Sequence, residues 1–84
     1  MEIRYGGPVP PSQQIAAWLR DRIQAGEFGD DDPLAAESAL VQELGVARTT
    51  VRRAIKILRE EGLVYTVQAR GTFVSADRPD RRWP

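Results

Sequence analysis

A glycine-centred turn between two amphipathic segments constrains the fold of this chain more than any other feature. The turn lies at Gly45, and apolar residues recur at three- and four-residue spacing on both sides of it. Such spacing places apolar side chains along one face of a helix. Those after the turn are Val51, Ala54, Ile55 and Leu58. The pattern predicts a helix-turn-helix, with helices over about 37–44 and 48–61 that end at Gly45 and Gly62.

The second of these helices concentrates positive charge on its remaining faces. Between residues 48 and 59 there is no acidic side chain, and the basic ones are Arg48, Arg52, Arg53, Lys56 and Arg59. A helix with one apolar and one cationic face, behind a tight turn, has the shape and charge to lie in the major groove of DNA. Charges that merely keep a surface helix in water give the same pattern. The helix alone therefore leaves both interpretations open.

The flanking segments complete a winged helix-turn-helix. A first helix is predicted from near Pro11 to Gly26, with Ser12 as its N-cap and a buried stripe at Ile15, Leu19 and Ile23. Residues 63–67 and 72–75 are rich in β-branched and aromatic residues, and a turn over 68–71 separates them. The predicted fold is mainly α with a small β-hairpin, an α+β arrangement of three helices and a two-stranded wing.

The 84 residues are enough for one small domain. Residues 1–10 contain two glycines and two prolines and predict a flexible N-terminal arm. Residues 11–75 form the predicted winged helix-turn-helix domain, and the charged, aperiodic residues 76–84 predict a disordered tail. The acidic run at residues 30–32 lacks EF-hand spacing and is interpreted as a solvated loop.

Composition removes several classes of function. The chain has no histidine and no cysteine, so the usual general base, thiol nucleophile and zinc ligands are missing, and we expect no enzyme, cofactor or metal. No apolar run reaches the roughly 20 residues that span a bilayer, which favours a soluble, cytoplasmic protein. The net charge is zero, but residues 21–43 hold seven acidic side chains against one basic. This separation leaves one positive face.

Several short motifs follow one another within residues 11–75. They are Leu19-Arg-Asp-Arg-Ile23, Gly26-Glu-Phe28, Glu43-Leu-Gly-Val46, Arg48-Thr-Thr-Val-Arg52, Glu61-Gly-Leu-Val64 and Arg70-Gly-Thr-Phe-Val74. Together with Glu37 and Leu40, these motifs resemble the GntR family of bacterial transcription regulators. The resemblance implies a sequence-specific DNA-binding regulator, more often a repressor than an activator, in a bacterial cytoplasm.

The resemblance also implies a set of DNA contacts. Arg48 and Arg52 look like the family's major-groove arginines, and a guanidinium fork matches O6 and N7 of guanine. The two residues between them that open the helix look like phosphate or base-edge contacts, and the wing over 68–72 looks like a minor-groove or backbone contact. Arg53 and Lys56 are phosphate contacts or plain surface. The expected DNA-binding set is Arg48, Thr49, Thr50, Arg52, Arg53, Lys56, Gln68, Arg70 and Thr72.

Some positions depart from the family pattern. Ser38 stands where a basic residue is common, and Ala36 replaces a usual N-cap serine. Ala69 occupies a wing-tip position where glycine is common. The turn there must either avoid a positive φ or bear strain.

A regulator of this kind implies double-stranded DNA with a palindromic operator, whose half-sites lie one helical turn, roughly 34–36 Å, apart. We therefore expect a weak homodimer that forms mainly on DNA, with no membrane partner and no small-molecule effector site in this chain. Two alternatives remain open. One is a winged-helix protein–protein interaction module, which the neutral net charge and the acidic segment 27–37 fit. The other is a truncated DNA-binding head of a larger effector-responsive regulator, instead of a complete short one.

Overall fold

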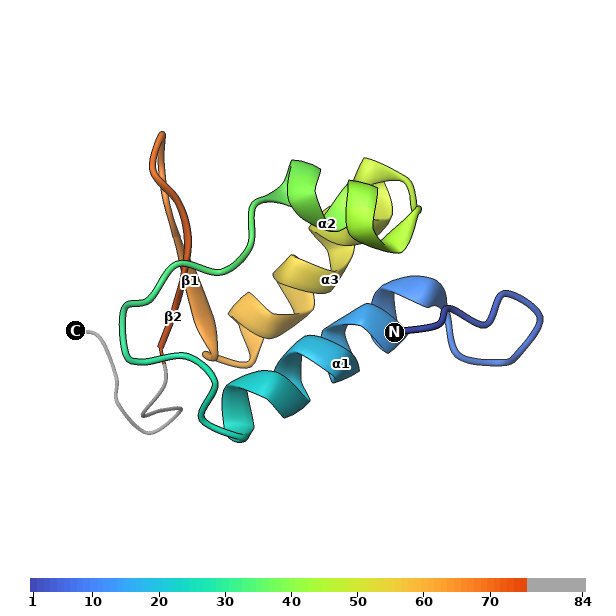
Figure 1. The fold of residues 1–84 in the computed structure, drawn as a ribbon, viewed down its shortest axis with the longest axis horizontal. Coiled ribbons are helices and arrows are strands. Elements are labelled where there is room, and N and C mark those ends of the chain that lie inside the picture. The colour runs from blue at the N-terminus through green and yellow to red at the C-terminus, as the bar shows by residue number, and fades with distance from the viewer. Residues whose placement is uncertain (76–84) are drawn as a thin grey trace.

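The computed structural model describes residues 1–75, in which three helices precede a hairpin (Figure 1). Helix α1 lies along one side of the molecule, while α2 and the tip of the hairpin rise on the other side. The strands are antiparallel, with Val64 opposite Val74 and Val67 opposite Gly71. This is the predicted winged helix-turn-helix, and the predicted tail over 76–84 lies outside the described residues. The elements are α1 (Pro11–Gln24), α2 (Glu37–Leu44), α3 (Arg48–Glu60), β1 (Val64–Val67) and β2 (Gly71–Val74).

Glycine ends α2 as predicted. Gly45 has φ +67° and ψ +36°, and its N–H donates to the carbonyl oxygen of Val41 at 2.9 Å. Helix α1 begins at Pro11 as predicted, but the predicted cap is wrong, because no side chain caps the helix. Proline at the first helical position lacks an N–H and has a helical φ already fixed, so Ser12 is not needed as a cap.

The core lies between α1 and α3 and is closed by α2 and the base of the hairpin. All three predicted stripe residues of α1 are buried, as are all four apolar residues of the α3 stripe. Helix α2 contributes Leu40, which is 1% exposed. The largest fully buried side chains are Ile15, Leu19, Leu40, Leu58, Val51 and Val74. The apolar pattern of the sequence therefore identifies the faces that pack.

The acidic loop does more than the sequence predicts. The main chain of residues 31–34 makes three hydrogen bonds of 2.7–2.9 Å with β2, and Pro33 forms an isolated bridge opposite Phe73. The Asp31 carboxylate accepts a 2.6 Å hydrogen bond from the Tyr65 hydroxyl on β1. The interpretation of this run as a merely solvated loop is incomplete, because the loop pairs with the outer edge of β2 like a short third strand of the wing.

Residues 1–10 lie against α1. The side-chain amide of Gln14 bonds the main chain of Arg4 through both its oxygen and its nitrogen, at 2.9 and 2.7 Å, and its nitrogen also donates to the carbonyl of Val9. Ile3 packs against the core. The flexibility of this arm stays a prediction. Within residues 1–75 no helix is long and apolar enough to cross a bilayer.

Candidate nucleic-acid interface

One side of α3 presents a continuous row of cations to solvent. Arg48, Arg52, Lys56 and Arg59 follow one another at four-, four- and three-residue spacing, which places them on one face of the helix. All four are exposed, and so is Arg53 beside them. The apolar face of α3 is buried against α1 and α2. Packing in the core thus fixes which side of α3 faces outward.

The first turn of α3 keeps donors available. Ala47 precedes the helix and supplies no side-chain cap. The main-chain N–H groups of Arg48 and Thr49 have no acceptor among the described residues, whereas that of Thr50 donates to the carbonyl of Ala47 at 3.0 Å. Thr49 is exposed and Thr50 half-buried. Helix N-termini of this kind bind phosphate through their N–H groups and their dipole.

Glu37, the first residue of α2, joins this cationic surface. Its carboxylate accepts hydrogen bonds from Nε of Arg52 at 3.1 and 3.2 Å, and from Nη1 of Arg48 at 3.4 Å. The arginine side chains remain 49% and 62% exposed, so these ion pairs add little to stability. The expected DNA-binding set omits Glu37, since only the angle between α2 and α3 brings it within reach.

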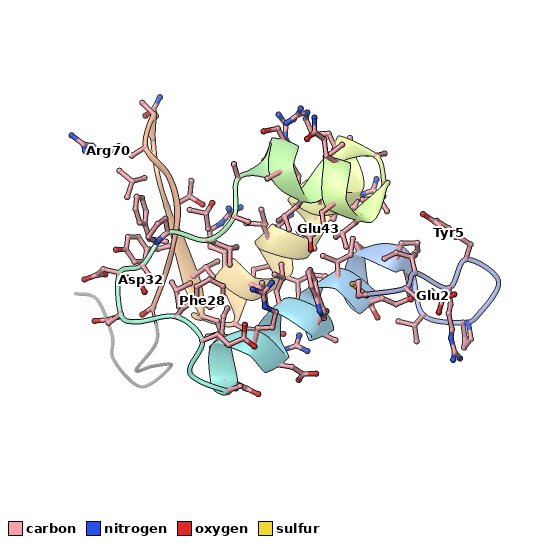
Figure 2. The ribbon with its side chains drawn as sticks, viewed as in Figure 1. Glu2, Tyr5, Phe28, Asp32, Glu43 and Arg70 are labelled. Atoms are coloured by element: carbon pink, nitrogen blue, oxygen red, sulfur yellow. The ribbon has the colours of Figure 1, made fainter. Side chains whose placement is uncertain are left out.

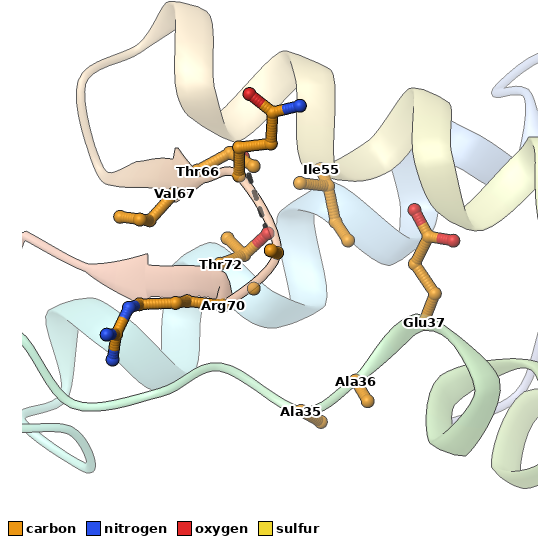
Figure 3. A pocket seen from close by; sticks show the side chains of 11 residues that line it. Ala35, Ala36, Glu37, Ile55, Thr66, Val67, Arg70 and Thr72 are labelled. Carbon is orange, nitrogen blue, oxygen red and sulfur yellow. Dashed lines mark hydrogen bonds between the residues drawn. The ribbon is translucent and has the colours of Figure 1, made fainter.

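A groove separates α3 from the wing, and Figure 3 shows its lining. On the wing side Thr66 and Thr72 face each other with their hydroxyl oxygens 3.4 Å apart. Nη1 of Arg59 donates to the hydroxyl of Thr66 at 3.1 Å and so ties the helix to the wing. Glu37 and Arg52 close the helix side. Thr66 is absent from the expected DNA-binding set, because only pairing across the hairpin places it opposite Thr72 in this groove.

The wing tip forms the outer end of this groove. Arg70 points outward from the hairpin, away from α2 and α3 (Figure 2), and Gln68 is exposed beside it. The turn is closed by a hydrogen bond from the Arg70 N–H to the carbonyl of Val67, at 3.0 Å. Ala69 has φ +69°, so the turn bears the strain that the sequence analysis anticipates. The structure thus lines one groove with Arg52, Thr72 and the wing-tip residues, and Arg48 lies beside it through its contact with Glu37.

The acidic side chains of the described residues do not form a metal site. Within residues 1–75 no group of three or more histidine, cysteine, aspartate or glutamate side chains lies close enough together to hold an ion. Asp31 accepts from Tyr65, and Asp32 accepts from the N–H of Gly29 at 2.7 Å. These carboxylates therefore organise the loop beside the wing.

Residues 11–74 match the bacterial regulatory proteins of the gntR family. The chain belongs to the GntR family. Among the relatives of this GntR chain, the HTH-type transcriptional repressor NagR of Bacillus subtilis is 38% identical over 81 residues. The mannosyl-D-glycerate transport/metabolism system repressor MngR of Escherichia coli is 42% identical over 72 residues. These alignments cover 96% and 86% of this chain, but only 33% and 30% of the relatives.

Solved structures agree with the fold. AraR(DBD) in complex with operator ORX1 superposes with a TM-score of 0.80 at 35% identity, over 89% of this chain and 96% of the other. YtrA from Sulfolobus acidocaldarius, a GntR-family transcription factor, gives a TM-score of 0.80 at 31% identity, over 92% and 81%. The GntR chain described here spans about a third of the length of the curated relatives. The comparisons point to a family of regulators and not to enzymes.

Proposed function

We propose that this chain binds double-stranded DNA sequence-specifically, as the DNA-binding part of a transcriptional repressor in a bacterial cytoplasm. The observation that carries the proposal is the exposed cationic row of α3, which core packing holds facing outward beside the wing groove. The names of NagR and MngR support repression, and the operator complex of AraR(DBD) supports DNA as the partner.

In the proposed complex the N-terminal half of α3 enters the major groove. Arg48 and Arg52 contact base edges there, with guanine as the preferred base because its O6 and N7 accept a guanidinium fork. Thr49 and Thr50 contact a phosphate or a base edge from the first turn. The cationic residues further along the helix contact phosphates, which adds affinity for any sequence.

The wing contributes a second contact region. Gln68 and Arg70 at its tip contact the minor groove or the backbone, where a narrow groove attracts a guanidinium. Thr72 lies deeper, in the groove beside α3, and contacts the backbone. Two copies bind the half-sites of a palindromic operator, roughly 34–36 Å apart. We propose that they associate weakly in solution and mainly on DNA.

The test is a binding titration with fluorescent duplexes. A duplex enriched by this chain from a random pool is compared with a scrambled duplex of the same composition, at two salt concentrations. Arg52→Ala should reduce selectivity by about 1–3 kcal/mol. Lys56→Ala should weaken binding to both duplexes equally and lower the salt slope by about one unit. Arg20→Gln, which removes the same charge from α1, should leave the selectivity unchanged.

Each result has a clear meaning. Enrichment of one sequence, with affinity that falls steeply as salt rises, supports the proposed function. No binding at low salt refutes it and favours a protein-interaction module. If the Arg52→Ala variant prefers the enriched duplex as strongly as the parent chain does, then α3 does not read bases.

A further inference from the structure

Glu37 is an acidic side chain within a surface that should attract DNA. It lines the groove between α3 and the wing, and its side chain is 34% exposed. A carboxylate there repels phosphates and weakens binding to every DNA sequence. Figure 3 shows Glu37 at one end of the groove, at the start of α2. A carboxylate at this position should therefore have a favourable effect on binding that offsets the repulsion.

Glu37 contacts only one of the three guanidinium nitrogens of Arg52 and leaves the other two without a contact to it. Both carboxylate oxygens accept from Nε of Arg52, at 3.1 and 3.2 Å. Neither Nη1 nor Nη2 of Arg52 has a hydrogen-bond partner within residues 1–75. The end of the fork that can donate to O6 and N7 of guanine therefore stays open.

Glu37 is itself held in place. It is the first residue of α2, and α2 is anchored in the core by Leu40, which is 1% exposed. The same Oε1 atom accepts from Nη1 of Arg48 at 3.4 Å, so one carboxylate gathers both arginines that open α3. A long arginine side chain loses rotamer freedom when it binds. A carboxylate that restricts it beforehand reduces that loss.

We propose that Glu37 is a positioning residue that orients the Arg52 guanidinium, and through a weaker contact that of Arg48, for recognition of guanine. This inference rests on the proposed function. Glu37 lowers affinity for DNA in general and raises affinity for the correct sequence. Its net effect is to widen the ratio between specific and non-specific binding.

The opposite signs of these two effects make the test sharp. Glu37→Gln removes the negative charge and weakens the hold on Nε of Arg52. It should bind a scrambled duplex a few-fold more tightly and the enriched duplex less tightly, so that the ratio of the two affinities falls about tenfold. Glu43→Gln is the matched control. Glu43 lies on the same helix, is exposed and has no ion pair within residues 1–75, so its substitution should leave the ratio unchanged.

A second variant separates orientation from charge and from folding. Glu37→Asp keeps the charge but shortens the side chain, so the carboxylate retreats from Arg52. We expect unchanged affinity for the scrambled duplex and a reduced ratio. Thermal unfolding of each variant shows whether α2 is still folded, since an acidic residue also stabilises a helix N-terminus. A new enrichment with Glu37→Gln should show a weaker guanine preference at one position of each half-site.

The outcomes distinguish this inference from the proposed function. If Glu37→Gln keeps the ratio of the parent within about twofold, the positioning role is overturned and the proposed function stands. If Glu37→Gln and Glu43→Gln tighten both duplexes equally, Glu37 acts only through its charge, which also overturns the role. If the parent chain itself enriches no sequence, the proposed function fails and this inference fails with it.

Discussion

The strained wing tip makes a quantitative prediction. Ala69 has φ +69° and lies in the turn that the Arg70 N–H closes onto Val67. Within residues 1–75 only Asp31 and Ala69 combine a side chain with a positive φ. A single positive φ at the third position is the pattern of a type II turn, which prefers glycine there. Replacing Ala69 by glycine should therefore relieve the turn.

The magnitude follows from two opposing terms. The left-handed conformation costs an alanine about 1–2 kcal/mol. Glycine relieves this strain, but it also makes the unfolded chain more flexible, which destabilises the folded state by about 0.5–1 kcal/mol. The side chain of Ala69 is exposed, so no packing is lost. We expect Ala69→Gly to stabilise the fold by about 0.5–1 kcal/mol, which raises the Tm by about 2–8 °C for a domain of this size.

Thermal unfolding followed by circular dichroism measures this, with two matched substitutions. Gly45→Ala places an alanine at φ +67° where the new Cβ meets nothing within 4 Å, so it should destabilise by a similar amount. Ala25→Gly at φ −76° changes only the unfolded chain and should destabilise by about 0.5–1 kcal/mol. If Ala69→Gly lowers the Tm as Ala25→Gly does, the turn carries no strain and the reasoning is refuted.

Two further predictions concern stability. Leu58→Ala empties a site that is 0% exposed and should cost about 2–5 kcal/mol in urea unfolding; a cost below about 1 kcal/mol would mean that the core closes over the cavity. Hydrogen bonds from Arg20 hold the pKa of Glu61 below its ordinary value of 4.5, so this pair should contribute stability above that pH and lose it as the pH falls further. Because the side chains are 29% and 38% exposed, Glu61→Gln should cost less than about 1 kcal/mol at pH 7 and nothing near pH 2, and an equal cost at both pH values would exclude the ion pair as its cause.

The helices could be predicted because local signals agree there. Apolar spacing and a glycine at the end fix α2, and its bounds match the prediction. The sequence predicts the start of α1 near Pro11 correctly but the cap wrongly, because Ser12 lies inside the helix, one residue after the proline that begins it. The pairing of Pro33 with Phe73 could not be predicted from the sequence, since proline and the three aspartates before it have low strand propensity. Such pairing depends on contacts across about 40 residues.

The site was predictable to the extent that it lies on one element. The cationic row of α3 follows from helical spacing alone. Glu37 contacts two arginines that follow it by 11 and 15 positions, and Arg59 contacts Thr66 across the end of α3. Both contacts depend on the angles between the elements, which the sequence does not reveal. The assignment of individual side chains to DNA stays a prediction until binding is measured.

The loop beside β2 also decides how the sheet ends. A strand at the edge of a sheet usually exposes N–H and C=O groups on which another chain can assemble. Here the position next to β2 is taken by the segment around Pro33, which has no N–H to donate. Asp31 and Asp32 beside it add negative charge. This side of the wing should therefore not pair with a strand of another molecule. A small exposed hairpin can then protrude from the molecule without promoting aggregation at high protein concentration.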